Sequence, residues 1–231
     1  MLWYYGIDWT YLVIVLPMVL LAMWASFNVN STYKKYSKVT SKSGYTANDV
    51  VRNILDAYGL QHIGIEHIKG DLTDHYDPKA NVIRLSDTTY GSRSAAAIGV
   101  AAHEAGHAVQ HATGYAPIKL RMAMVPVCNI GSVLSIPLIL IGMVFSYPTL
   151  SVLGVVAFSL VTLFQLVTLP VEFNASRRAL AILQNAQMPE EDIYASKKVL
   201  TAAALTYVAA LAVSLANLLR LVLIVSGKSR D

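Results

Sequence analysis

The fold is decided by a stretch without a single charged side chain, MAMVPVCNIGSVLSIPLILIGMVFSYPTLSVLGVVAFSLVTLFQLVTLPV (residues 122–171). A helix needs about 20 apolar residues to cross the ~30 Å hydrocarbon layer of a bilayer. These 50 residues therefore predict two spans, separated by a turn at residues 146–149. Shorter charge-free runs at 9–33 and 199–219 predict one span each. The sequence thus indicates an α-helical multi-pass membrane protein with about four transmembrane helices.

Composition and charge placement agree with this fold class. Hydrophobic residues make up 55% of the chain and charged residues only 14%. Of the 18 Lys and Arg residues, 11 lie between positions 28 and 127 and four between 171 and 199. The positive-inside rule then places both polar segments in the cytoplasm, and the N-terminus and the turn near Tyr147 outside. We interpret the basic pI as this topological bias, so no nucleic-acid partner is expected.

The polar segment after the first span predicts a small α+β portion. Thr46, followed three residues later by Asp49, is a capping box that starts a helix, and Gly59 ends it. Alternating apolar residues predict two or three short strands, the last over 82–86. A helix over about 94–112 follows. We therefore expect both helix and strand in this portion.

That last helix carries the motif His103-Glu104-Ala105-Gly106-His107. Two histidines four apart project from one face of a helix, so both imidazoles can bind one zinc ion. Glu104 lies between them, where it can act as general base on a zinc-bound water. The plainer reading is two structural histidines on a buried helix. It is disfavoured because two histidines and a glutamate are costly to bury without partners.

A third protein ligand must come from elsewhere, because catalytic zinc commonly takes three and keeps one position for water. Glu172 is the best candidate, since it follows the apolar hairpin at the point where the chain returns to the polar layer. Its position alone equally fits an interfacial acid paired with Arg177 or Arg178.

His111, one turn beyond His107, is the rival ligand. A helix rises 1.5 Å per residue, so His111 lies roughly 6 Å farther along the axis, which suits a single tetrahedral ion poorly. A metzincin arrangement also fails, because Gln110 and Thr113 stand where Gly and His are required. We expect His111 to support the site or to face solvent.

At these residues the chain resembles the YugP-like family of neutral zinc metallopeptidases, which are bacterial membrane proteins. The resemblance covers nearly the whole length, from the first span through His-Glu-Ala-Gly-His-Ala and the hairpin to Leu-Pro-Val-Glu-Phe-Asn-Ala-Ser at 169–176. More distantly, the chain is similar to HtpX-like membrane proteases and other gluzincins. The resemblance implies that His103, His107 and Glu172 bind the metal and that Glu104 is the catalytic base.

One position departs from the wider group. Ser176 stands where those enzymes have an Asp that supports a histidine of the first helix. A serine hydroxyl can donate or accept a hydrogen bond but carries no charge. Asn174 is a candidate to assist it.

Motif and resemblance together predict a membrane-embedded endopeptidase with one Zn²⁺, in which Glu104 takes the proton of a zinc-activated water. The expected substrates are membrane proteins or peptides near the cytoplasmic membrane surface, and the strand over 81–86 is expected to pair with them by strand addition. Two alternatives stay open. One is a non-catalytic zinc-binding scaffold or subunit. The other is a site-2-type intramembrane metalloprotease, disfavoured because no Asp lies between Asp87 and Asp192.

The predicted organisation places a zincin-like peptidase portion at the cytoplasmic face of a bacterial plasma membrane. The expected segments are 1–33 (first transmembrane helix), 34–121 (α+β peptidase portion with the His-Glu helix), 122–171 (transmembrane hairpin), 172–198 (helix of the third ligand and connector) and 199–231 (last transmembrane helix and tail). Residues 171–187 are expected to form a helix of their own. Pro189, followed by three acids, is expected to start the next one.

Overall fold

A computed structural model describes residues 9–228. The first eight residues and the last three lie outside this range, and the last three include Arg230 of the predicted tail. The chain forms two compact units. One, here the apolar unit, comprises Met1–Ser26, Leu120–Pro170 and Leu205–Asp231. The other, the polar unit, comprises Phe27–Lys119 and Val171–Ala204.

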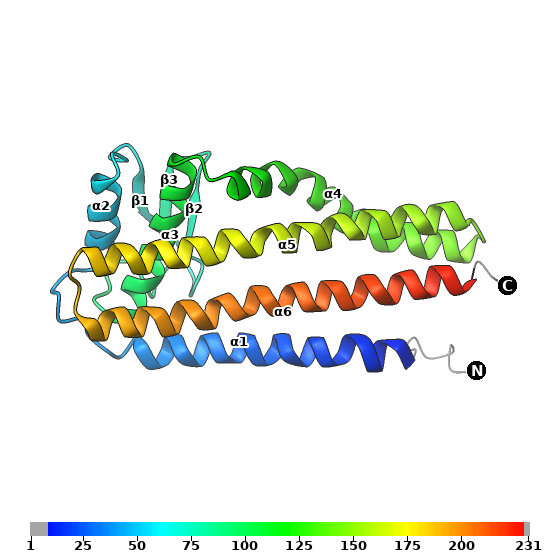
Figure 1. Ribbon diagram of the computed structural model, residues 1–231, viewed down its shortest axis with the longest axis horizontal. Helices are drawn as coiled ribbons and strands as arrows, with labels where there is room; N and C mark the ends of the chain where they lie inside the picture. The colour runs from blue at the N-terminus through cyan, green and yellow to red at the C-terminus, as the bar shows by residue number, and fades with distance from the viewer. Residues whose placement is uncertain (1–8, 229–231) are drawn as a thin grey trace. The chain divides into compact units, whose positions relative to one another are not determined.

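Four helical stretches within residues 9–228 are long and apolar enough to cross a membrane, which confirms the predicted number of spans. They are the π-helical turn η2 (Tyr11–Val15) with α1 (Leu16–Tyr36), then α4 (Ala116–Val144), α5 (Pro148–Asn185) and α6 (Glu190–Lys228) (Figure 1). The wider turn before α1 has a local cause. Pro17 has no N–H to donate to the carbonyl one turn earlier, so the helix rearranges there.

The hairpin turn lies where the sequence predicts it, because α4 ends at Val144 and α5 begins at Pro148. The separate helix expected over 171–187 is wrong. Those residues are the last part of α5, which runs unbroken through Pro170. A proline inside a helix removes one hydrogen bond but is tolerated in apolar helices, where local adjustment re-satisfies the freed backbone groups. Similarly, α6 starts after Pro189 and continues through the last span as one helix.

Small residues bring helices of the apolar unit into backbone contact. A Cβ added to Gly154 of α5 would lie 2.6 Å from the Ser135 carbonyl oxygen of α4, and one added to Gly131 would lie 3.1 Å from that of Ala157. Such close approach is the usual packing mode in membranes, where no hydrophobic effect drives helices together. A 2.8 Å hydrogen bond between the hydroxyls of Thr162 and Ser214 links α5 to α6.

The polar unit contains the expected α+β portion. Its first helix, α2 (Ala47–Ala57), begins with the predicted capping box of Thr46 and Asp49. Three short strands follow, namely β1 (Gly64–His67), β2 (His75–Asp77) and β3 (Val82–Leu85). They form one sheet in the order β1-β3-β2, with β1 parallel and β2 antiparallel to β3 (Figure 1).

This order corrects one prediction about the sheet. The strand expected to receive an extended substrate is β3, but β3 is central and has a neighbour on each side. The hydrogen-bonding groups along both its edges face β1 and β2, so no additional strand can pair with it. Spacing along the sequence does not reveal strand order, and here the later strand is inserted between the two earlier ones.

Helix α3 (Ala95–Ala112) carries the His-Glu motif and begins at Ser94, whose side chain accepts from the Ala97 N–H at 3.2 Å. Its small side chains let two other helices approach closely. A Cβ added to Gly99 would lie 2.8 Å from the Ser196 side chain of α6, and one added to Gly106 would lie 2.8 Å from the Ala175 carbonyl oxygen of α5. Helix α3 thus packs into the core of the polar unit among these neighbours.

Candidate metal centre

Three residues of the polar unit converge on one point. The ligand atoms of His103, His107 and Glu172 all lie within 4.8 Å of one another. Glu172 Oε2 is 3.2 Å from His103 Nε2 and 3.5 Å from His107 Nε2, and its side chain is only 3% exposed. The two imidazole rings stand nearly perpendicular, with centroids 4.7 Å apart. The structure therefore brings together all three residues predicted as metal ligands.

Local features explain this convergence. His103 and His107 lie one turn apart on α3, so both rings leave the helix on the same side. Glu172 comes from α5, which can approach α3 closely because Gly106 has no side chain to meet the Ala175 carbonyl. A glycine between the two histidines therefore helps to bring the distant carboxylate within reach.

The Nδ1 atom of each histidine has a polar partner of its own. Ser176 Oγ lies 3.1 Å from His103 Nδ1, so the serine that departs from the wider group still occupies the supporting position. Gln110 Oε1 lies 3.0 Å from His107 Nδ1. The sequence suggested that Asn174 assists Ser176, but the structure places it elsewhere. The Oδ1 atom of Asn174 accepts hydrogen bonds from Gln110 Nε2 and Arg178 Nε.

Glu104 faces the same region but is not one of the three converging residues. Its carboxylate is buried, and Oε2 accepts a 3.1 Å hydrogen bond from the backbone N–H of Tyr76 in β2. Burial raises the pKa of the Glu104 carboxyl, while the nearby His103 and His107 oppose that rise. A buried carboxylate that binds a proton more readily than usual suits a general base.

The charge of Glu172 also affects His107. Burial by itself lowers the pKa of His107, but the hydrogen bond and the negative charge of Glu172 outweigh it, and the net direction is upward. The carboxylate therefore favours positive charge at this place. A divalent cation is another way to supply that charge.

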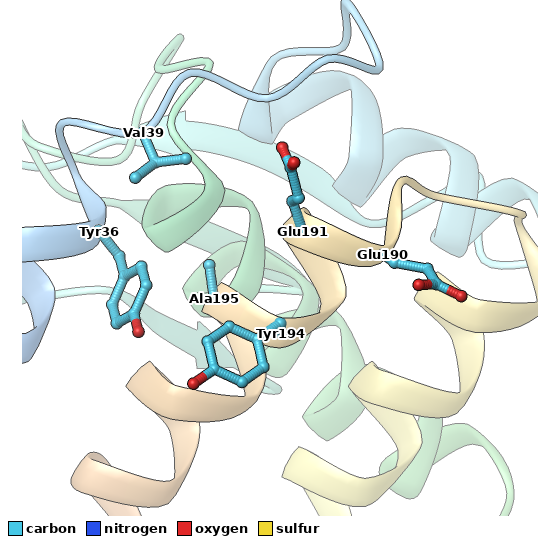
Figure 2. Close-up of a pocket in the computed structure, with 6 residues that line it drawn as sticks. All are labelled: Tyr36, Val39, Glu190, Glu191, Tyr194 and Ala195. Carbon is cyan, nitrogen blue, oxygen red and sulfur yellow. The ribbon is translucent and has the colours of Figure 1, made fainter.

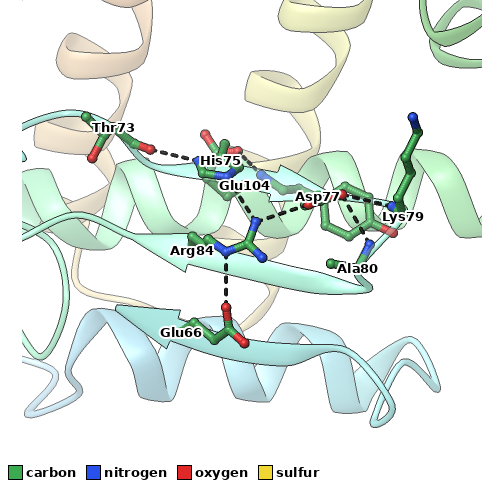
Figure 3. A network of polar contacts seen from close by, with 9 residues as sticks. Glu66, Thr73, His75, Asp77, Lys79, Ala80, Arg84 and Glu104 are labelled. Carbon is green, nitrogen blue, oxygen red and sulfur yellow. Dashed lines mark hydrogen bonds and ion pairs between the residues drawn. The ribbon is translucent and has the colours of Figure 1, made fainter. Parts of the chain in front are cut away.

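A polar network holds β2 in position beside Glu104 (Figure 3). Arg84 of β3 donates from Nε to Glu66 of β1 at 3.0 Å and from Nη1 to Asp77 of β2 at 3.1 Å. His75 Nδ1 lies 2.9 Å from the Thr73 carbonyl, so Nδ1 donates and Nε2 can accept from Arg84 at 3.4 Å. One guanidinium thus crosslinks all three strands.

Other candidates from the sequence lie outside the metal group. The ring of His111 packs edge to face against Tyr76, with centroids 6.1 Å apart. Arg178 donates to Asn174 and lies over the Tyr115 ring at 5.9 Å. Glu172 faces the two histidines, with Oε2 at 3.2 and 3.5 Å from their Nε2 atoms, which favours a metal ligand over the interfacial acid.

A separate pocket of about 380 Å³ lies where α1 ends and α6 begins (Figure 2). Two tyrosine rings, those of Tyr36 and Tyr194, line it and meet edge to face at 6.5 Å. Lys35 and Lys198 lie over these two rings, at 5.3 and 5.2 Å. None of the three converging residues lines this pocket.

The donor set fits zinc. Two imidazole nitrogens and one carboxylate oxygen form one of the ligand combinations of catalytic zinc, which leaves a position for water. Both histidines direct Nε2 toward Glu172 and have Nδ1 beside a polar partner, as ligating histidines commonly do. Sequence reasoning missed Gln110 and the Tyr76 backbone. The i, i+3 spacing of His107 and Gln110 indicates that these two side chains can meet on the helix. The contact from the Tyr76 backbone N–H has no such signal in the sequence, because it comes from a distant strand.

Comparison with known proteins agrees with this chemistry. Residues 11–226 match the family described as "Putative neutral zinc metallopeptidase". The chain is 48% identical over 205 residues to the "Putative membrane protease YugP" of Bacillus subtilis (strain 168). The aligned residues cover 88% of this chain and 91% of that protein. No solved structure matches the chain. The match over nearly all its length shows that the chain belongs to the neutral zinc metallopeptidase family.

Proposed function

We propose that the protein is a zincin-like endopeptidase in which His103, His107 and Glu172 hold one Zn²⁺ and Glu104 is the general base. The observation that carries this proposal is the convergence of two imidazoles and a carboxylate within 4.8 Å. A second buried carboxylate, Glu104, lies between the two histidines on the same helix. A purely structural zinc site has no use for such a base, because its coordination is normally closed.

Held by these three residues, the metal would supply Lewis-acid chemistry, lowering the pKa of a water molecule toward about 7 and polarising a substrate carbonyl. Glu104 would take a proton from the attacking water and deliver it to the leaving amine. The Tyr76 N–H holds one carboxylate oxygen of Glu104 in a fixed place. His103 and His107 keep their Nδ1 atoms on Ser176 and Gln110, so the opposite nitrogens stay directed at the metal position.

Substrate is proposed to bind in extended form along β2. This strand has β3 on one side only, and its Tyr76 N–H already donates to Glu104, so a substrate strand would pair through the remaining main-chain groups of the other edge. The same strand contacts Glu104 through the Tyr76 backbone, which would bring a bound peptide next to the base. The hydrogen bonds of Arg84 to Glu66 and Asp77 hold β2 to the rest of the sheet while substrate is bound.

The active portion is proposed to face the cytoplasm, where it would cleave membrane proteins or peptides close to the bilayer. Two observations support this location. Most Lys and Arg residues lie in the two polar segments, as expected for cytoplasmic segments. The tyrosines and lysines around the pocket at the α1 and α6 ends are residue types typical of a membrane–water interface.

The site-2-type alternative requires the His-Glu motif to lie within a membrane span. Among residues 9–228, α3 is not one of the four helices with the length and hydropathy of a span. The third candidate ligand is also a Glu from α5, not a later Asp. These two observations favour a site outside the hydrocarbon layer.

The test is Glu104→Gln in the purified full-length chain. The substitution keeps the side-chain size and an oxygen that can accept the Tyr76 N–H, but it removes the base. We expect zinc stoichiometry to stay unchanged and the zinc-dependent cleavage of casein, an unfolded protein, to fall by about 10²–10⁴-fold.

Glu191→Gln is the matched control, because Glu191 is an exposed acid of the same unit that pairs with Lys42 and not with the metal group. It should retain both zinc and cleavage. Full proteolysis by Glu104→Gln would refute the general-base role. A wild-type protein that binds zinc but cleaves nothing would favour the scaffold alternative.

A further inference from the structure

Gln110 is a fully buried polar residue with hydrogen-bond partners at both ends of its side-chain amide. It is 0% exposed and lies on α3 one turn beyond His107. Its Oε1 lies 3.0 Å from His107 Nδ1, and its Nε2 lies 2.8 Å from the Val171 carbonyl and 3.0 Å from Asn174 Oδ1. A buried amide is costly unless its hydrogen bonds are made, and here both ends have partners.

The direction of each hydrogen bond is fixed by groups that have only one role. The Val171 carbonyl can only accept, so the amide nitrogen of Gln110 must face it. Arg178 can only donate, so the atom of Asn174 that it contacts at 2.8 Å is the oxygen, and this oxygen accepts from Gln110 as well. The remaining atom of Gln110, its oxygen, therefore faces His107.

This orientation determines where the neutral His107 ring carries its hydrogen. An amide oxygen cannot donate, so His107 Nδ1 must be the donor, and the lone pair of the ring is then on Nε2. Nε2 is the atom that lies 3.5 Å from Glu172 Oε2, on the side where the candidate ligands converge. Ser176 cannot set the tautomer of His103 in this way, because a hydroxyl can donate or accept.

We propose that Gln110 is a positioning residue, which holds His107 in the Nδ1–H tautomer and fixes α5 on both sides of Glu172. Its amide nitrogen binds Val171, the residue before Glu172, and Asn174, two residues after it. One side chain thus prepares one ligand and restrains the segment that carries another. This inference rests on the proposed zinc site and names a residue that the site depends on.

The test compares Gln110→Met with the control Thr113→Val. Methionine has a similar length but cannot form these hydrogen bonds. Thr113 lies on the same helix end, and its hydroxyl donates to the carbonyls of Val109 and Gln110. Zinc affinity, measured against a competing chelator in the solubilised full-length chain, should fall about 10–100-fold in Gln110→Met. It should be unchanged in Thr113→Val.

A second readout needs no metal, and its wild-type measurement does not require the Gln110 variant to fold. Nitrogen-15 NMR of the metal-free wild type, labelled at histidine and measured at a pH where the rings are neutral, reports the tautomer of each ring. The His107 signal is assigned by its loss in His107→Asn. We expect Nδ1–H in the wild type and a mixture of both tautomers in folded Gln110→Met.

An Nε2–H tautomer in the wild type, or unchanged zinc affinity in folded Gln110→Met, overturns the inference. Failure of the proposed function looks different. In that case the folded wild type binds no zinc, while the tautomer measurement still tests the role of Gln110.

Discussion

In both the polar and the apolar unit, glycines allow helices to approach closely, but the close approach has a different consequence in each unit. In the apolar unit, Gly131 and Gly154 let α4 and α5 pack backbone against backbone. In the polar unit, Gly106 permits the same close approach between α3 and α5, but the residues beside that contact are His103, His107 and Glu172. The first contact serves packing alone, whereas the second also sets the distance between candidate ligands. Adding a methyl group at a glycine should therefore affect cleavage in the polar unit but not in the apolar unit.

The largest effect is expected where a ligand itself is removed. Glu172→Gln keeps the shape of the side chain but removes its charge, so zinc affinity should fall by more than the roughly 10–100-fold that loss of a supporting partner causes. Thr162→Val, which removes a buried hydroxyl pair with Ser214 from the apolar unit, serves as control on the same helix. It should leave zinc binding intact. Equal zinc affinity in both variants would contradict the assignment of Glu172.

The comparison of glycines is tested directly by Gly106→Ala and Gly154→Ala. Each added Cβ would meet a carbonyl oxygen, at 2.8 Å from Ala175 and at 2.6 Å from Ser135 respectively. Both variants should lose about 1–3 kcal/mol of stability through overpacking. Only Gly106→Ala should also lower cleavage, by on the order of 100-fold, because it displaces the helix that carries Glu172. Thermal unfolding and cleavage assays measure the two effects. Similar losses of cleavage in both would break the comparison.

The smallest effect concerns the start of α2, far along the chain from the ligands. Thr46→Ala removes the cap and should lower the free energy of unfolding by about 1 kcal/mol. The hydrogen bonds from Thr46 lower the pKa of Asp49, so this carboxylate stabilises the fold when it is ionised. Its contribution is present above the ordinary pKa of about 3.9 and is lost as the pH falls through the lower folded value. The difference in stability between the wild type and Asp49→Asn should therefore shrink on acidification, as chemical denaturation at each pH would reveal.

Much of the architecture could be predicted because it depends on local properties. Hydropathy is a property of each run of residues, so the four spans and the turn before Pro148 followed from composition. The capping box of α2 involves residues three apart and was equally predictable. The separate helix over 171–187 was wrong, because the end of the charge-free run at Val171 was taken as the end of a helix, whereas α5 continues through it.

The candidate site was predictable only in part. The i, i+4 spacing of the two histidines indicated a shared face, while Glu172 needed the resemblance to a family to become the preferred third ligand. The strand order of the sheet depends on pairing between distant segments, so the edge position of β2 could not be deduced. Likewise, Asn174 turns out to serve the Gln110 side of the site and not Ser176, which depends on side-chain directions across two helices.

The hydrogen bond from the Tyr76 N–H to Glu104 has a consequence for how the family can diversify. A main-chain amide is the same whatever residue stands at that position, apart from proline, which has none. The side chain at position 76 can therefore change while the amide that orients the Glu104 carboxylate stays the same. The orientation of the proposed base thus does not depend on which side chain stands at that position.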